Sequence, residues 1–353
     1  MTGQDPGAVT DGAARATISD VARRAAVSRQ TVSNAVHNPD RLSPETLRRV
    51  QRAIDDLGYR PQAAAQSLRH QRTGAIGFEI GSRGPRRANE TVSPVLASLA
   101  IAAAENDCHI VPFGSNTSTP MIDGYRAMWR SRLVDAFIIA DTHHGDPRPE
   151  WLARNGIPFV SFGRVWDDPT FTRWVDVDGG AGTTEAVHHL AGAGYHTVAF
   201  LGWPEGSVTG DDRRRGWARA CDVADVRRGP EATSRQVLDD AVRAAQPLVG
   251  SLDPGSAVLC ASDLLALAVR HVAVEERRVV GPDLGIVGFD GSFLAEMHHL
   301  STIEQPYPLI AEKLLHLIRD ALHEEPSPAS GRLVAPSLID RTSSSRLVPR
   351  DQT

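Results

Sequence analysis

The chain has 353 residues, of which 41% are hydrophobic and 23% charged, and a formal net charge of −5. At about 100–200 residues per domain, this length predicts two or three folding units with buried cores, and the ordinary composition excludes collagen, coiled-coil rods and wholesale disorder. The first 17 residues hold no apolar segment, and no stretch of about 18 uncharged apolar residues occurs. We therefore expect neither a signal peptide nor a membrane span, and a cytoplasmic protein.

The charge is unevenly distributed along the chain. Residues 15–72 contain eleven arginines and five acids, a net charge of +6, so the remainder carries −11. A basic head on an acidic body favours a polyanionic partner for the head, although a solvated helical face would give the same count. The three cysteines, Cys108, Cys221 and Cys260, form no CxxC pair, so we expect buried reduced thiols rather than disulfides or a zinc site.

The head begins with two short predicted helices. Thr17 is a candidate cap for the first helix, with Asp20 as the acid of a capping box. Ser28 is a candidate cap for a second helix, Arg29–His37, in which Val32 and Val36 would point inward.

A third helix follows after a short connection. Ser43 and Pro44 form a start signal, and Gly58 is a stop signal. Its apolar stripe is Leu47, Val50, Ile54 and Leu57. Three helices in this order predict a helix-turn-helix module whose second helix enters the major groove. Arg29 and Gln30 would then read bases, since Arg pairs with guanine and Gln with adenine.

The run TISDVARRAAVSRQTVSNAVHNPDRLSPETLRRVQRAIDDLGYRPQAAAQSLR resembles the DNA-binding head of the lactose-repressor and galactose-repressor (LacI/GalR) family. The DVA helix, the VSxxTVS recognition helix, the LGYxP ending and the short AxxL hinge all stand at the family's spacing. Many members have Arg after TVS where this chain has Asn34, so the base read there would differ. The resemblance and the helix pattern together nominate DNA contacts at Thr17, Ser28, Arg29, Gln30, Thr31, Ser33, Asn34, His37, Tyr59, Gln66 and Leu68.

The resemblance also implies a role for the hinge, residues 61–69. In relatives this segment folds only on operator DNA, where the residue matching Leu68 wedges between central bases of the minor groove. The sequence AAAQSL has high helix propensity but is too short to be stable alone, which suits folding coupled to binding.

From Gly74 onward, short apolar runs alternate with helical stretches, which predicts parallel sheets covered by helices on both faces. The expected strands are residues 75–80, 109–113, 136–140, 158–162, 197–202, 256–261 and 285–290. The sequence contains no GxGxxG, Walker, HExxH or GxSxG motif, and we expect no cofactor, no metal and no catalytic residues. The Gly-rich turn after Asp178 is interpreted as a helix start.

This body resembles the effector-binding core of the same family, which is similar to periplasmic sugar-binding proteins. The landmarks are VDVDGGAGTTEAVHHLAGAGYHTVAFLG, RRRGWARA, VLCASDLLALAVR, GIVGFDG and SLIDRTSS. The implied fold is an all-α helix-turn-helix head with an α/β body of two Rossmann-like lobes. The expected division is a tail (1–16), the head (17–60), a hinge and linker (61–73), the body (74–342) and a C-terminal tail (343–353). Within the body, one lobe takes about 74–176 plus 304–332, and the other about 177–303 plus 333–342.

By the same resemblance, an effector would lie between the lobes. Its predicted ligands are Arg164, Trp203, Arg213, Ser262, Asp263 and Asp290, with Asp263 also capping the next helix. Planar bidentate donors, carboxylates and an aromatic face suit a sugar, and Trp166 and Trp174 are further candidates for that face.

Several alternatives remain open at this point. The loop after the first strand lacks the family's asparagine-proline-aromatic sequence, so a purine, a phosphorylated metabolite or no ligand at all stays open. Arginines 83, 86 and 87 would favour an anion, although a solvated loop would also carry them. A sugar-binding protein or an α/β enzyme using His143 and His144 are the competing classes. We expect a homodimer on a palindromic operator, without the leucine-heptad tail of tetrameric relatives.

Overall fold

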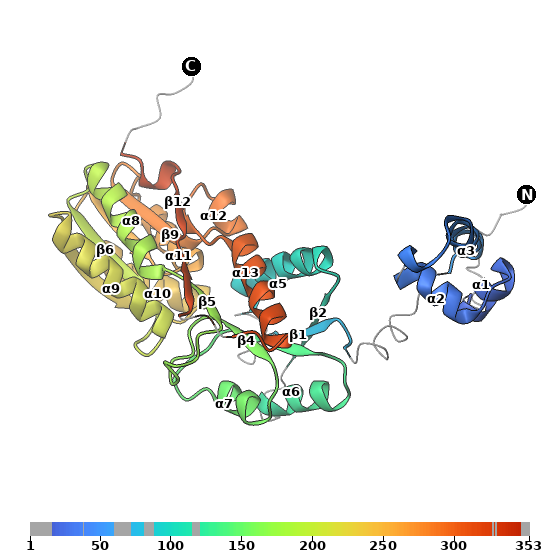
Figure 1. Ribbon diagram of the computed structural model, residues 1–353. Coiled ribbons are helices and arrows are strands. Elements are labelled where there is room, and N and C mark those ends of the chain that lie inside the picture. The colour runs from blue at the N-terminus through green and yellow to red at the C-terminus, as the bar shows by residue number, and fades with distance from the viewer. Residues whose placement is uncertain are drawn as a thin grey trace, which may run out of the picture. The chain divides into compact units, whose positions relative to one another are not determined.

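The computed structural model describes residues 16–37, 39–59, 72–80, 88–114, 121–326, 328 and 330–346. The chain divides into two compact units, Met1–Thr73 and Gly74–Thr353, called here the head and the body. The predicted fold class is confirmed, with a helical head and an α/β body (Figure 1).

The head contains three α-helices and one 3-10 turn among its described residues. Their bounds are α1 Ile18–Ala25, α2 Arg29–His37, η1 Pro39–Arg41 and α3 Pro44–Leu57. The Thr17–Asp20 capping box is formed, and Gly58 ends α3 with a φ of 57°. The buried residues of this small core are Val21, Ala22, Ala25, Val32, Ala35, Val50, Ala53 and Tyr59. Val32 is buried as predicted, whereas Val36 is half-buried.

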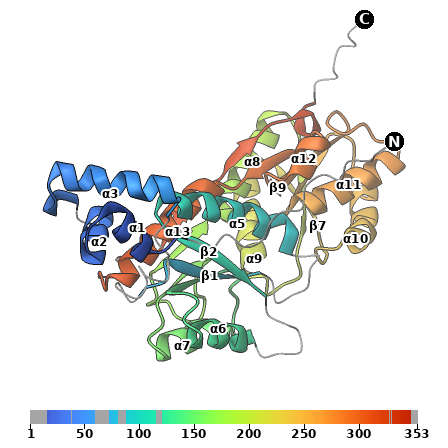
Figure 2. The ribbon, with the colours of Figure 1, turned by 90° about the vertical axis from the view of Figure 1, so that its right-hand side faces the viewer.

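The body contains two six-stranded sheets. The first has the order β11-β5-β4-β3-β1-β2, with every pair parallel. Its strands are β1 Ala75–Glu79, β2 His109–Phe113, β3 Ala136–Ile139, β4 Phe159–Phe162, β5 Trp174–Val177 and β11 Arg332–Val334. Its helices are α5 Ala88–Glu105, α6 Met121–Arg130, α7 Pro147–Arg154 and α13 Tyr307–Leu322. In Figure 2, α6 and α7 lie on one side of β1 and β2, and α5 and α13 lie on the other.

The second sheet has the order β12-β10-β9-β8-β6-β7. Its strands are β6 Thr197–Gly202, β7 Arg227–Thr233, β8 Ser256–Cys260, β9 Leu284–Asp290, β10 Ser301–Glu304 and β12 Ser337–Ile339, and only the β10–β12 pair is antiparallel. Its helices are α8 Gly179–Gly192, α9 Val208–Val223, α10 Leu238–Gly250, α11 Asp263–Glu275 and α12 Phe293–Met297, and the 3-10 turn η2 covers Thr342–Ser344. The turn after Asp178 opens α8, as the sequence predicted, with the Asp178 carboxylate accepting from Ala181 N.

The chain passes between the two sheets three times, after β5, after β10 and after β11. The sequence missed β5, β7, β10, β11 and β12, because these strands are short or exposed and lack a continuous apolar run. The lobe boundaries themselves remain a prediction, and β11, at residues 332–334, lies in the first sheet. Cys221 and Cys260 are buried, whereas Cys108 is only half-buried, contrary to the expectation for all three.

Candidate functional site

The start of α2 is held by a small hydroxyl network. Ser28 Oγ accepts a hydrogen bond from Thr31 N at 3.0 Å, and the Ser28 and Thr31 hydroxyls lie 2.9 Å apart. Ser28 therefore caps α2, and the Thr31 hydroxyl is bonded to that cap. A phosphate contact by either hydroxyl remains a prediction.

The outward face of α2 carries the long polar side chains of the head. Arg29 and Gln30 are exposed, and Ser33 and Asn34 are half-buried. Gln30 Nε2 donates to Asn34 Oδ1 at 3.2 Å, so the two amides form one polar surface along the helix. Val32, on the opposite face, is fully buried in the head core. This division leaves Arg29, Gln30 and Asn34 available to a groove while Val32 fixes the helix.

Two other predicted DNA contacts have structural roles. The Thr17 hydroxyl donates to Asp20 Oδ2 at 2.6 Å within the α1 cap. Tyr59 is only 9% exposed in the head core, and burial raises the pKa of its phenol. Of the remaining candidates, the His37 side chain, Gln66 and Leu68 lie outside the described residues, together with the hinge and arginines 83, 86 and 87.

In the body, Trp203, Arg213, Ser262 and Asp290 form what we call the carboxyl-edge cluster of the second sheet. Trp203 follows β6, Ser262 follows β8 and Asp290 ends β9, while Arg213 reaches this edge from α9. Carboxyl ends of parallel strands meet at one edge, which is where α/β proteins commonly bind small molecules.

Arg213 is the buried cation of the cluster. Its side chain is 4% exposed, it donates from Nη1 to Ala261 O at 2.5 Å, and the same nitrogen lies 3.6 Å from Asp290 Oδ1. The guanidinium carbon lies 3.5 Å from the centre of the Phe289 ring and 5.3 Å from that of Trp203. Nε has no hydrogen-bond partner among the described residues. Burial lowers the pKa of Arg213, and the Asp290 charge acts in the opposite direction.

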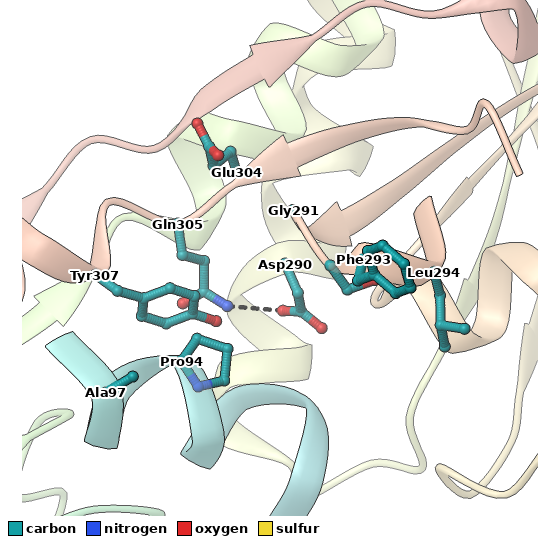
Figure 3. Close-up of a pocket in the computed structure, with 10 residues that line it drawn as sticks. Pro94, Ala97, Asp290, Gly291, Phe293, Leu294, Glu304, Gln305 and Tyr307 are labelled. Carbon is teal, nitrogen blue, oxygen red and sulfur yellow. Dashed lines mark hydrogen bonds between the residues drawn. The ribbon is translucent and has the colours of Figure 1, made fainter. Parts of the chain in front are cut away.

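Asp290 connects this cluster to a pocket. Its Oδ1 accepts from Gln305 Nε2 at 2.7 Å, a bond drawn in Figure 3. Its φ of 118° is unusual for a non-glycine residue, a conformation that costs about 1–3 kcal/mol and is common at binding sites. The pocket has a volume of about 490 Å³, and its lining residues are Pro94, Ala97, Asp290, Gly291, Ser292, Phe293, Leu294, Glu304, Gln305 and Tyr307. Asp290 is the one predicted effector ligand among them.

The prediction that Asp263 caps α11 is wrong. The residue that caps α11 is Ser262, whose Oγ accepts from Leu265 N at 3.4 Å, and not Asp263. Asp263 is 1% exposed, and its carboxylate accepts from the Thr302 hydroxyl at 2.6 Å and from Ser292 N at 2.7 Å. These two bonds show that the side chain of Asp263, the first residue of α11, points toward β10 and the loop before α12.

Arg164 lies among two carboxylates and two indoles. Its Nε lies 3.3 Å from Asp176 Oδ2, and its Nη2 lies 3.4 Å from Asp212 Oδ2. Its guanidinium carbon is 5.3 Å from the Trp166 ring centre and 5.9 Å from that of Trp174. Burial raises the pKa of Asp176 to about 6, against the opposing charge of Arg164.

Sequence reasoning missed four polar residues of these sites: Asp176, Asp212, Gln236 and Gln305. Asp212 directly precedes Arg213 in α9, and Gln305 directly follows β10, so proximity to Arg213 and to a strand end were the available signals. Gln236 lies in the loop after β7, a strand that the sequence did not predict.

The arrangement offers hydrogen bonds and charge rather than reactive groups. His144 Nδ1 lies 2.7 Å from the exposed Asp167 carboxylate. Within the described ranges, no cluster of three His, Cys, Asp or Glu side chains is placed to hold a metal. No described helix is both long enough and apolar enough to span a bilayer.

Two protein-family models match this chain, one over the head and one over part of the body. The model of bacterial regulatory proteins of the lacI family matches residues 17–62, and a periplasmic binding protein-like domain matches residues 187–344. The regulator CelR of Thermobifida fusca is 29% identical over 319 residues, covering 88% of this chain and 93% of CelR. The regulator AglR of Rhizobium meliloti is 30% identical over 277 residues, covering 77% of each chain.

Solved structures agree with these sequence matches. A CelR–cellobiose complex is 26% identical with a TM-score of 0.65, covering 93% of this chain and all of that one. The matches extend over the helical head and the α/β body described above. This chain belongs to the lacI family of bacterial regulatory proteins, whose members are DNA-binding transcriptional regulators and not enzymes.

Proposed function

We propose that this regulator binds a palindromic operator as a homodimer in the cytoplasm, at the nucleoid. A neutral sugar bound to the body would control the affinity of the protein for that operator. Two heads are needed to read two half-sites, and a closed two-fold dimer supplies them. The exposed Arg29, Gln30 and Asn34 of α2 are the proposed base readers. Ser28, Thr31 and Ser33 are the proposed phosphate anchors.

The observation that carries the effector site is the buried Arg213–Asp290 pair. Both side chains are 4% exposed, and the two charges are 3.6 Å apart at the carboxyl edge of the second sheet. A buried guanidinium whose Nε has no partner among the described residues, with a carboxylate beside it, can donate to and accept from vicinal hydroxyls. The adjoining pocket of about 490 Å³ lies within the usual range of small-molecule sites, about 300–1,000 Å³.

Cellobiose is the first sugar to test, since it is bound in the CelR complex described above. We propose that binding closes or twists the two halves of the body and so changes how the hinge segments are held. The coupling is reciprocal, and factors of about 5–150 are typical. An inducer would then bind operator-free protein more tightly by the same factor by which it weakens operator binding.

The experiment is a gel-shift titration of the full-length protein against its own upstream DNA, with and without cellobiose. Thermal-shift measurements on a panel of sugars, nucleosides and sugar phosphates run in parallel, because a ligand at about 100 times its Kd adds about 2.7 kcal/mol of stability. We expect a neutral sugar to stabilise the body and to change operator affinity. Stabilisation by a nucleoside or a sugar phosphate alone would refute the proposal that the effector is a neutral sugar. Equal affinity for every promoter fragment and for random duplex would refute the proposal that the protein binds a specific operator.

A further inference from the structure

Three loops follow adjacent strands of the second sheet, and one side chain connects them. β7, β6 and β8 are neighbours in that order, and all three run parallel. Trp203 follows β6, Gln236 lies beyond the end of β7, and Ser262 follows β8. Their side chains therefore share the carboxyl edge of the sheet, where Arg213 also lies.

The Gln236 amide oxygen is the common acceptor of this group. It receives a hydrogen bond from Trp203 Nε1 at 2.6 Å and another from Ser262 Oγ at 2.9 Å. The indole N–H is the one polar group of a tryptophan side chain, so this bond fixes the direction in which the ring points. Ser262 is fully buried, and its oxygen also accepts from Leu265 N, which anchors the acceptor to the start of α11.

The backbone supports the same arrangement. Ser234 N donates to Gly202 O at 2.9 Å, which ties the loop after β7 to the end of β6 just before Trp203. A methyl group built on Gly210 would lie 3.0 Å from Trp203 Cε3, so the six-membered ring of the indole lies close to α9. The ring therefore contacts α9 at Gly210 and bonds the loop after β7 through Gln236.

The geometry points to Gln236 as a positioning residue of the effector site, one that holds the Trp203 indole as an aromatic face for a sugar ring beside Arg213. This inference rests on the proposed function, because it assigns the sugar a stacking surface. Sugars stack their C–H faces on indoles while buried guanidiniums bind their hydroxyls, and the Arg213 guanidinium carbon lies 5.3 Å from the Trp203 ring centre. Gln236 would act through Trp203 and not by touching the sugar.

The test compares three full-length variants for cellobiose affinity by calorimetry. Gln236→Leu removes the acceptor, and we expect Kd to rise about tenfold, the equivalent of one well-placed aromatic contact. Gln236→Glu keeps an acceptor oxygen, and we expect it to bind within about threefold of wild type. In a Trp203→Phe background, Gln236→Leu is expected to add no further loss, because the N–H that it orients is absent.

A tenfold loss from Gln236→Leu that persists in the Trp203→Phe background would overturn the inference, since Gln236 would then contact the sugar itself. An unchanged Kd in Gln236→Leu would overturn it as well.

A second measurement needs no ligand and separates this inference from the proposed function. The near-ultraviolet circular dichroism of Trp203 is obtained as wild type minus Trp203→Phe. We expect Gln236→Leu to lose most of that signal and Gln236→Glu to keep it, with far-ultraviolet spectra confirming that all variants fold. A Trp203 signal that survives in Gln236→Leu refutes the inference whatever the effector is. Absence of cellobiose binding in wild type, with the signal lost as expected, would count against the proposed sugar alone.

Discussion

Arg164 and Asp212 connect the two sheets of the body through one ion pair, with 3.4 Å between Nη2 and Oδ2. Arg164 follows β4 of the first sheet, whereas Asp212 lies in α9, which packs on β6 and β7 of the second. The Arg164 side chain is 27% exposed, and pairs of this kind contribute about 0–1 kcal/mol. The pair therefore adds little stability. It shows instead that Arg164, a predicted effector ligand, is paired with Asp176 and Asp212 in this structure.

Asp176→Asn is expected to remove a pH dependence of stability. Burial raises the Asp176 pKa from 3.8 to about 6, so the folded protein holds this proton more tightly than the unfolded chain does. Its contribution favours folding at low pH, falls as pH rises from about 4 to about 6, and is constant above that. At about 1.4 kcal/mol per pH unit, the loss over the whole titration amounts to about 3 kcal/mol, of which about 2 kcal/mol falls between pH 4.5 and pH 7.5. Urea unfolding at pH 4.5 and 7.5 measures it, and a wild type-to-variant difference equal at both pH values would contradict it.

Arg148→Met is expected to destabilise the body by about 3–5 kcal/mol. Arg148 is 4% exposed, and its Nη1 and Nη2 lie 2.8 Å and 2.7 Å from the buried carboxylates of Glu79 and Asp146. The substitution removes the cation and leaves the Glu79 and Asp146 carboxylates buried without its charge. The matched control is Arg154→Met on the same helix, whose ion pair with Glu150 is exposed and worth about 0–1 kcal/mol. Equal denaturation midpoints for the two variants would argue against a buried ion network.

Gly216→Ala is expected to lower stability by about 1–3 kcal/mol through overpacking. A Cβ at this position would lie 2.3 Å from Thr183 Oγ1 and 2.5 Å from Gly180 O, where α9 packs against α8. The control is Gly192→Ala at the end of α8, where a Cβ meets nothing within 4 Å, and which should stabilise by about 0.4–1 kcal/mol. Calorimetric unfolding of both variants tests the close approach of the two helices, and a neutral Gly216→Ala would exclude it.

Arg29→Ala combined with Gln30→Ala is expected to abolish operator preference while leaving cellobiose binding intact. Each base contact is worth about 1–3 kcal/mol of discrimination. Arg23→Ala on α1, where the side chain is 79% exposed, is the charge control and should weaken operator and random duplex alike. Competition gel shifts at fixed salt give the ratio of the two affinities. Loss of the head's helical signal in the double variant would show that these side chains support the fold, contrary to their exposure in α2.

Local signals determined the head almost completely. Thr17, Ser43 and Gly58 act where the sequence placed caps and a stop, because capping and helix periodicity involve residues only three or four positions apart. The long apolar strands of the body were likewise readable, since a buried parallel strand is apolar along its whole length.

The polar site depended on contacts between distant residues. Gln236 meets Trp203 and Ser262 across 33 and 26 positions, and Arg164 meets Asp212 across 48. No periodicity or spacing in the sequence encodes such pairs. The order of the strands in each sheet brings these loops together, and the sequence did not predict β5 or β7, two of the strands involved. The sequence by itself determined a three-helix head, an α/β body and the residue types of a site. The tertiary structure decided which of those side chains face one another and which are already paired.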